Sequence, residues 1–91
     1  MGMAKVTFTA NIQRHVECPE VVAAGATLRE VLDRVFEQHL RARSYFLDDQ
    51  AGLRTHIAVF IDGQLALDRR HLTDPVAPHS NIFVAQALSG G

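Results

Sequence analysis

The chain has 91 residues, of which 47% are hydrophobic and 21% charged, and its formal net charge is -1 at pH 7. This length suits one small domain, the composition argues against disorder, and the near-neutral charge excludes the basic surface typical of nucleic-acid-binding proteins. The single cysteine, Cys18, excludes an internal disulfide. Because no segment has the pattern of a signal peptide or a membrane span, the sequence predicts a cytoplasmic protein that binds neither membrane nor nucleic acid.

A half-buried strand is predicted near the N-terminus, because apolar and polar residues alternate from Val6 to Ile12. A turn is expected over Asn11 to Arg14, and a second strand from about Val16 to Val22. Pro19 within this second strand cannot donate a hydrogen bond to a neighbour, so the strand is expected at an edge of the sheet.

An amphipathic helix is predicted from Leu28 to about Leu40. Thr27 and Glu30 have the spacing of a capping box, in which each side chain accepts a backbone N–H at the start of the helix. Apolar residues then recur at helical spacing, with charged residues between them. The apolar positions are Leu28, Val31, Leu32, Val35 and Phe36.

A β-hairpin is the clearest pattern in the second half of the chain. Arg41 to Thr55 is mostly polar and is predicted to be a surface loop. Asp62 and Gly63 then form a strong two-residue turn signal between predicted strands at His56–Ile61 and Gln64–Leu67.

The last strand is expected at Ile82 to Leu88, after an irregular connection over residues 68–80. The order strand, strand, helix, strand, strand, strand predicts an α+β domain. We expect a mixed sheet of four to five strands with one main helix packed on one face. Residues 1–88 are interpreted as this single domain, and residues 89–91 as a flexible Ser-Gly-Gly tail.

This element order and three short segments resemble the β-grasp fold of ubiquitin and of the ThiS/MoaD family of sulfur carriers. The segments are Thr27–Leu32, Val59–Gly63 and Ala87–Gly91. Residues 78–81 read Pro-His-Ser-Asn, which departs from the acidic Asp-Gly-Asp-like turn frequent in the family. Residues 43–55 are similar to the longer loop of sulfur carriers that serve cysteine synthesis.

The resemblance implies a non-enzymatic sulfur carrier, without cofactor or metal, whose reactive group is the α-carboxylate of Gly91. In the family, an ATP-dependent activating enzyme adenylates this carboxylate, and a sulfur donor or sulfurtransferase converts it to a thiocarboxylate. A downstream synthase then accepts the sulfur in the biosynthesis of a cofactor such as molybdopterin or thiamine, a thionucleoside or an amino acid.

The residue types of the tail suit delivery of a carboxyl group into a narrow site. Gly90 and Gly91 have no Cβ and allow close approach, and with Ser89 they reach roughly 10 Å when extended. This length would place Gly91 inside a partner enzyme while the domain stays outside. The alternative is that the glycines form an inert polar tail.

A partner-binding surface is predicted on the sheet. Alternation along the predicted strands places Phe60, Phe83 and Ala85 on one outward-facing side, and Ala87 continues this surface toward the tail. Exposed aromatic side chains on one face indicate an interaction site. The alternative is a pattern shifted by one residue, with both phenylalanines in the core.

Other chemistry has weaker support. The histidines show no recognisable ligand spacing and are interpreted as surface or loop residues; they are His15, His39, His56, His71 and His79. Cys18 lacks the cationic neighbours that favour a thiolate and is interpreted as a partly buried strand residue. Asp48, Asp49 and Asp68 have no paired catalytic motif and are interpreted as solvated turn residues.

Two further functions stay open. One is a ubiquitin-like modifier, in which Gly91 forms an isopeptide bond with a lysine of a target protein. Lys5 is the single lysine of the chain, which leaves little scope for self-linked chains. The other is a non-catalytic β-grasp binding subunit with an inert tail.

Overall fold

The computed structural model describes residues 2–14 and 20–86. Five strands form one mixed sheet in the order β2-β1-β5-β3-β4, in which β1 and β5 are parallel neighbours and the other pairs are antiparallel. The strands are β1 (Ala4–Phe8), β2 (Val21–Ala23), β3 (Ile57–Ile61), β4 (Gln64–Leu65) and β5 (Asn81–Gln86). The helices are α1 (Ala10–Gln13), α2 (Leu28–Gln38) and α3 (Leu40–Phe46).

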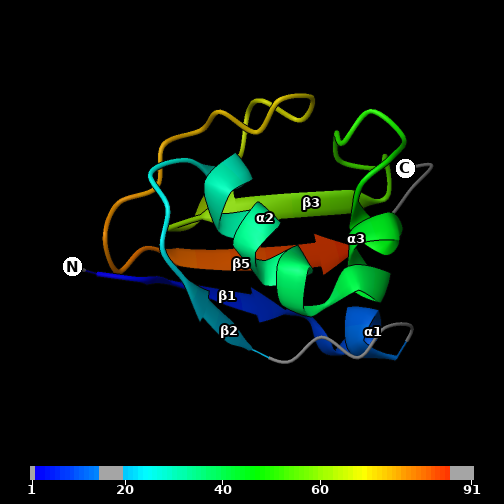
Figure 1. Ribbon diagram of the computed structural model, residues 1–91, viewed down its shortest axis with the longest axis horizontal. Helices are drawn as coiled ribbons and strands as arrows, with labels where there is room; N and C mark the ends of the chain where they lie inside the picture. The colour runs from blue at the N-terminus through cyan, green and yellow to red at the C-terminus, as the bar shows by residue number, and fades with distance from the viewer. Residues whose placement is uncertain (1, 15–19, 87–91) are drawn as a thin grey trace.

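Helices α2 and α3 lie against one face of this sheet (Figure 1). The α+β architecture with one main helix on a mixed sheet is therefore confirmed. Strand β2 lies at the edge of the sheet, as predicted, although Cys18 and Pro19 lie outside the described residues. Within the described ranges, no helix has the length and apolar character needed to cross a membrane.

Helix α2 begins with the predicted cap. The Thr27 side chain accepts the Glu30 N–H at 3.3 Å, and the Glu30 carboxylate accepts the N–H of Ala26, one residue before the cap, at 3.2 Å. All five predicted apolar positions of the helix are buried. The helix ends at Gln38, before the expected Leu40, because His39 has a non-helical backbone.

Helix α3 corrects the prediction that residues 41–55 are a surface loop. Its buried residues are Ala42 and Phe46, and the Phe46 ring lies 5.3 Å from the Phe8 ring and 5.6 Å from the Phe36 ring, between centroids. A helix of seven residues is too short to be stable alone, so packing on β1 and α2 stabilises it.

Smaller differences lie at the ends of the elements. The turn predicted over residues 11–14 is the single helical turn α1, capped by the Thr9 side chain, which accepts the Ile12 N–H at 3.4 Å. The hairpin strands are shorter than predicted, since β3 begins at Ile57 and β4 ends at Leu65. Strand β5 runs to Gln86, and residues 87–88 of the predicted strand lie outside the described residues.

The irregular connection over residues 68–80 is confirmed, and two aspartates order it. The Asp68 carboxylate accepts the Arg70, His71 and Thr73 N–H groups and the Thr73 hydroxyl. The Asp74 carboxylate accepts the Leu67 and Asp68 N–H groups. Two apolar residues of the connection, Leu72 and Val76, are buried in the core. The connection is therefore a structural part of the domain.

We expect the domain to lose stability in acid, and Asp68 to account for part of the loss. The Thr73 hydroxyl and the His71 N–H lower the pKa of Asp68 below its ordinary value of 3.8. A carboxyl whose pKa is lowered by folding stabilises the fold above its unfolded-state pKa, and this contribution is lost as the pH falls through the folded-state pKa. The melting temperature of Asp68→Asn should therefore depend less on pH than that of the wild type below about pH 5.

Thermal melts between pH 7 and pH 3 test this expectation. Asp49→Asn is the control, because the Asp49 side chain is exposed and makes no hydrogen bond or ion pair within residues 2–14 and 20–86. Equal slopes of melting temperature against pH for the wild type and Asp68→Asn would contradict the assignment.

Candidate partner-binding face

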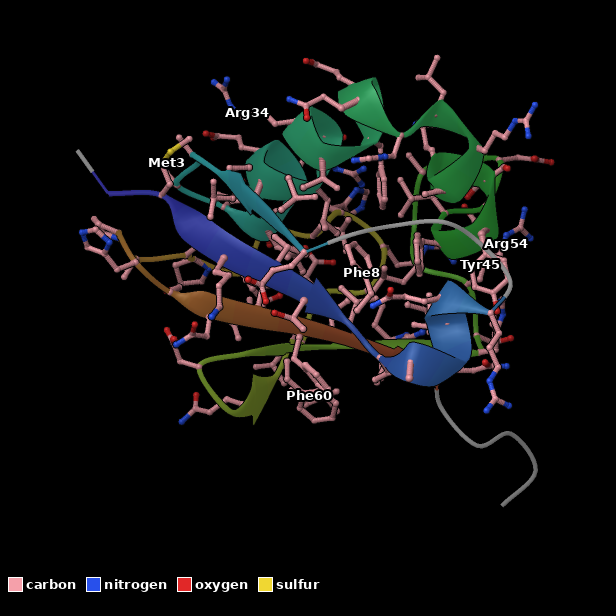
Figure 2. The ribbon with its side chains drawn as sticks, turned by 90° about the horizontal axis from the view of Figure 1, so that it is seen from below. Met3, Phe8, Arg34, Tyr45, Arg54 and Phe60 are labelled. Atoms are coloured by element: carbon pink, nitrogen blue, oxygen red, sulfur yellow. The ribbon has the colours of Figure 1, made fainter. Side chains whose placement is uncertain are left out.

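A row of side chains crosses the outer face of the sheet, opposite the helices. The strand register places Phe60 beside Phe83 on one side and beside Leu65 on the other, and Thr7 of β1 is the neighbour of Phe83. Phe83 is 44% exposed, Leu65 is 51% exposed and Phe60 is half-buried. Figure 2 shows Phe60 pointing away from the helices.

The next pair along β3 and β5 consists of Ala58 and Ala85, both half-buried. Because alanine side chains are small, this part of the face protrudes less than the part formed by the two phenylalanines. We call Ala58, Phe60, Leu65, Phe83 and Ala85 the sheet-face patch. The patch has no charged member, so its interactions with a partner would come from apolar burial.

Packing explains why these side chains face outward. The alternate residues of the same strands point to the helices, and four of them are buried; they are Ile57, Val59, Ile82 and Val84. The shifted register considered above, with both phenylalanines in the core, is therefore not the one in the structure. The structure brings together Phe60, Phe83 and Ala85, whereas Ala87, Ser89, Gly90 and Gly91 lie outside the described residues.

Leu65 and Ala58 belong to the patch but were not among the predicted residues. The sequence contains a signal for Leu65, because a two-residue hairpin turn fixes which residues face each other. With Asp62 and Gly63 as the turn, Ile61 faces Gln64 and Phe60 faces Leu65. Ala58 follows from the same alternation that identifies Phe60.

The hairpin turn also fixes the start of β5. Asp62 and Gly63 both have positive φ, at 50° and 86°, as a type I′ turn requires. The Asp62 carboxylate accepts the Asn81 N–H at 2.9 Å and the buried Ser80 hydroxyl at 2.8 Å, and these two bonds lower the pKa of Asp62. These two bonds therefore hold the turn at residues 78–81, whose sequence lacks the acidic pattern described above.

On the β1 side of the patch, the charged residues Lys5 and Glu20 form an ion pair. The Lys5 ammonium lies 4.0 Å from the Glu20 carboxylate, and both side chains are about half exposed. An exposed ion pair of this kind contributes about 0–1 kcal/mol to stability. The Lys5 side chain is half exposed, so it is accessible, and it lies on the same side of the sheet as that of its neighbour Asn81.

Asp48 and His56, considered above as possible site residues, make contacts that stabilise the local structure. The Asp48 carboxylate accepts the Gln50 and Gly52 N–H groups, which lower its pKa and shape a turn. The His56 ring packs edge-on against Tyr45, with 5.2 Å between centroids. Among the residues that the structure describes, no three metal-ligating side chains come together.

Solved structures share this fold over the full chain. No protein-family model matches the chain, and no curated protein sequence matches it. Small archaeal modifier protein 1 (SAMP1) from Haloferax volcanii is 22% identical, with a TM-score of 0.80 over 99% of this chain and 100% of its own. A chain of the Amycolatopsis orientalis BexX/CysO complex is 21% identical, with a TM-score of 0.79 over 97% and 99%.

A third similar structure is more distant in sequence. Urm1 from Trypanosoma brucei is 16% identical, with a TM-score of 0.68 over 99% of this chain and 96% of its own. Identities this low establish the fold alone, and the alignments cover 97–99% of this chain. The chain therefore has the ubiquitin-like β-grasp fold that its sequence resemblance predicts.

Proposed function

We propose that the chain is a sulfur carrier whose reactive group is the C-terminal carboxylate of Gly91. The observation that carries the proposal is the combination of the β-grasp fold with a Ser-Gly-Gly segment after its last strand. Strand β5 ends at Gln86, so about five residues at 3.3–3.6 Å each can extend roughly 17 Å beyond the sheet. This reach suits delivery of a carboxyl group into a deep enzyme site.

The proposed chemistry takes place in two steps on an activating enzyme. The Gly91 carboxylate attacks the α-phosphate of ATP, which forms an acyl adenylate and releases pyrophosphate. Sulfide from a donor then attacks the acyl carbon, and AMP leaves with one of the original carboxylate oxygens, which yields the thiocarboxylate. If a sulfurtransferase persulfide attacks instead, AMP leaves in the same way, and a second thiol must cleave the resulting acyl disulfide to release the thiocarboxylate. The carrier contributes no catalytic base, because activation and sulfur supply come from its partners.

Intact-protein mass spectrometry tests the proposal. The chain is incubated with an activating enzyme from its source organism, ATP and a sulfur donor. Exchange of one carboxyl oxygen for sulfur should add about 16 Da, the mass change expected of thiocarboxylate formation by acyl transfer. A chain that keeps its mass while a known sulfur carrier is converted by its own enzyme would support the inert-tail alternative.

A ubiquitin-like modifier is the second candidate, favoured by the similarity to SAMP1, which is named a modifier protein. The activation step is the same, but a lysine amine of a target then displaces AMP and forms an isopeptide bond. The same mass experiment separates the two functions, because conjugation yields a species near the sum of two protein masses. Any self-conjugate would be linked through Lys5.

We propose that the sheet-face patch binds the activating enzyme. Truncation of an aromatic residue at the centre of an interface commonly costs about 2 kcal/mol, which is roughly 30-fold in affinity. The double variant Phe60→Ser/Phe83→Ser should therefore bind the enzyme at least about 30-fold more weakly. Calorimetry with the purified enzyme measures this loss.

Leu40→Ser is the matched control for the double variant. Leu40 is 72% exposed but lies on α3, on the helical side of the sheet, so its loss should leave affinity unchanged. Both variants should keep their circular dichroism spectra, because none of the three side chains is buried. Unchanged affinity of the double variant would exclude the patch as the contact surface.

A further inference from the structure

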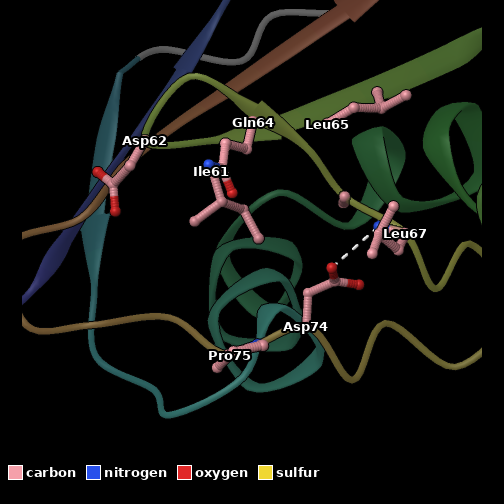
Figure 3. A pocket seen from close by; sticks show the side chains of 8 residues that line it. Ile61, Asp62, Gln64, Leu65, Leu67, Asp74 and Pro75 are labelled. Atoms are coloured by element: carbon pink, nitrogen blue, oxygen red, sulfur yellow. Dashed lines mark hydrogen bonds between the residues drawn. The ribbon is translucent and has the colours of Figure 1, made fainter.

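A groove runs along the free edge of β4, next to the sheet-face patch, with which it shares Leu65. Its volume is about 340 Å³, and Asp62, Gln64 and Leu65 line it together with residues of the connection that follows. The remaining lining residues are Ile61, Ala66, Leu67, Asp74 and Pro75. Figure 3 shows these side chains around the groove.

Leu67 is unusually exposed for an apolar side chain. It is 86% exposed, more than any other large hydrophobic residue among residues 2–14 and 20–86. Its backbone is nevertheless fixed, since the Asp74 carboxylate accepts the Leu67 N–H at 2.9 Å and the Asp68 N–H at 2.8 Å (Figure 3). Leu67 and the half-exposed Leu65 line the same groove, and exposed apolar side chains that lie together are typical of an interaction site.

The charge of the groove is of one sign. Asp62 lies at one end and Asp74 at the other, and no lysine, arginine or histidine lines the groove. The hydrogen bonds that lower the pKa of Asp62 keep its carboxylate ionised at neutral pH. Two carboxylates around an apolar floor are complementary to an apolar segment that carries positive charge.

The same charges argue against a second copy of the chain as the occupant. Two grooves facing each other would bring two Asp62 and two Asp74 carboxylates together, and like charges at an interface are unfavourable. Pairing of two β4 edges is also restricted, because β4 has two residues and the Leu67 N–H beyond it is already bonded to Asp74.

The groove lies far from the start of the tail. The Asp62 N–H donates to the Asn81 carbonyl at 2.8 Å at one end of β5, and the tail follows Gln86 at the other end. Five residues of strand separate these ends by about 17 Å. A segment bound in the groove would therefore leave the Gln86 end of β5 uncovered.

We propose that the β4 groove is a second docking site, which binds a short partner segment combining an aliphatic side chain with an adjacent lysine or arginine. The aliphatic side chain packs against Leu65 and Leu67, and the cation lies near Asp62 or Asp74. This site is independent of the chemistry at Gly91, so it can tether a partner while the tail is engaged elsewhere.

NMR titration with two capped hexapeptides tests the proposal. One peptide has the sequence Ala-Leu-Leu-Lys-Arg-Ala, and the other replaces the two basic residues by glutamates. The basic peptide should shift the amide signals of residues 61–67 and 74, with weaker binding at higher salt, and the acidic peptide should not. Leu67→Ser should weaken binding of the basic peptide at least about 10-fold, and Leu40→Ser should not change it.

Three results would overturn the proposal. The first is equal binding of the acidic and basic peptides, or binding of neither at millimolar concentration. The second is a set of shifts confined to Phe60, Phe83 and Ala85, which would place the peptide on the sheet-face patch. The third is a dimer of the free chain in sedimentation that Leu67→Ser dissociates, which would make a second copy the occupant.

Discussion

Deletion of Gly91 should slow activation of the chain by at least about 100-fold while leaving the domain unchanged. The variant still ends in a glycine carboxylate, but this group lies about 3.5 Å short of the position that the activating enzyme holds for reaction. Misplacements of this size cost on the order of 100-fold in rate. We expect the mass gain of about 16 Da to be at least 100-fold slower than in the wild type.

A second variant distinguishes the effect of tail length from the effect of a free Gly91 carboxylate. Extension of the chain by one residue after Gly91 converts its carboxylate to an amide, which cannot attack ATP, so activation of Gly91 should be lost altogether. Gly91→Ala retains the length and the carboxylate and is the control for the steric demand of the enzyme site. Melting curves of all variants should match the wild type, and full mass gain in the deleted or extended chain would show that Gly91 is not the reactive residue.

Phe46→Ala should destabilise the domain more than any change on the sheet-face patch. The Phe46 ring is 1% exposed and packs against both Phe8 and Phe36. Replacement of a buried phenylalanine by alanine costs about 3–5 kcal/mol, whereas the whole domain is expected to have about 5–15 kcal/mol. For a domain of this size, we expect the melting temperature to fall by about 12–40 °C.

Urea denaturation of Phe46→Ala measures this loss directly. Leu40→Ala is the control, because Leu40 belongs to the same helix and is 72% exposed, so its replacement should change the stability by less than about 0.5 kcal/mol. A loss below about 1 kcal/mol for Phe46→Ala would mean that α3 does not pack on the core as the structure shows.

The elements that the sequence predicts well are those with local signals. Helix α2 has its cap at Thr27 and a full apolar stripe, and the β3–β4 hairpin has its turn at Asp62 and Gly63. Helix α3 has neither a capping side chain nor a long stripe. Its stability depends on the packing of Phe46 against Phe36 of the preceding helix and against Phe8, which is distant in sequence, so local pattern could not reveal it.

The same distinction applies to the candidate sites. Alternation within single strands was enough to place Phe60, Phe83 and Ala85 on one face of the sheet. The β4 groove required knowledge of a contact between separate segments, because Asp74 positions Leu67 from across the connection. From the sequence, Asp68 is interpreted as a solvated turn residue, yet its hydrogen bonds, together with those of Asp74, order the connection.

The parallel pairing of β1 with β5 also constrains how the chain folds. Lys5 lies beside Asn81 and Phe8 beside Val84, so the centre of the sheet joins segments from opposite ends of the sequence. Contacts between residues so distant in sequence slow folding, because a long loop must close before they form. During synthesis, the sheet cannot close until residue 86 has left the ribosome. An activating enzyme that recognises the folded sheet face would therefore bind only chains in which β5 is free to pair with β1 and β3.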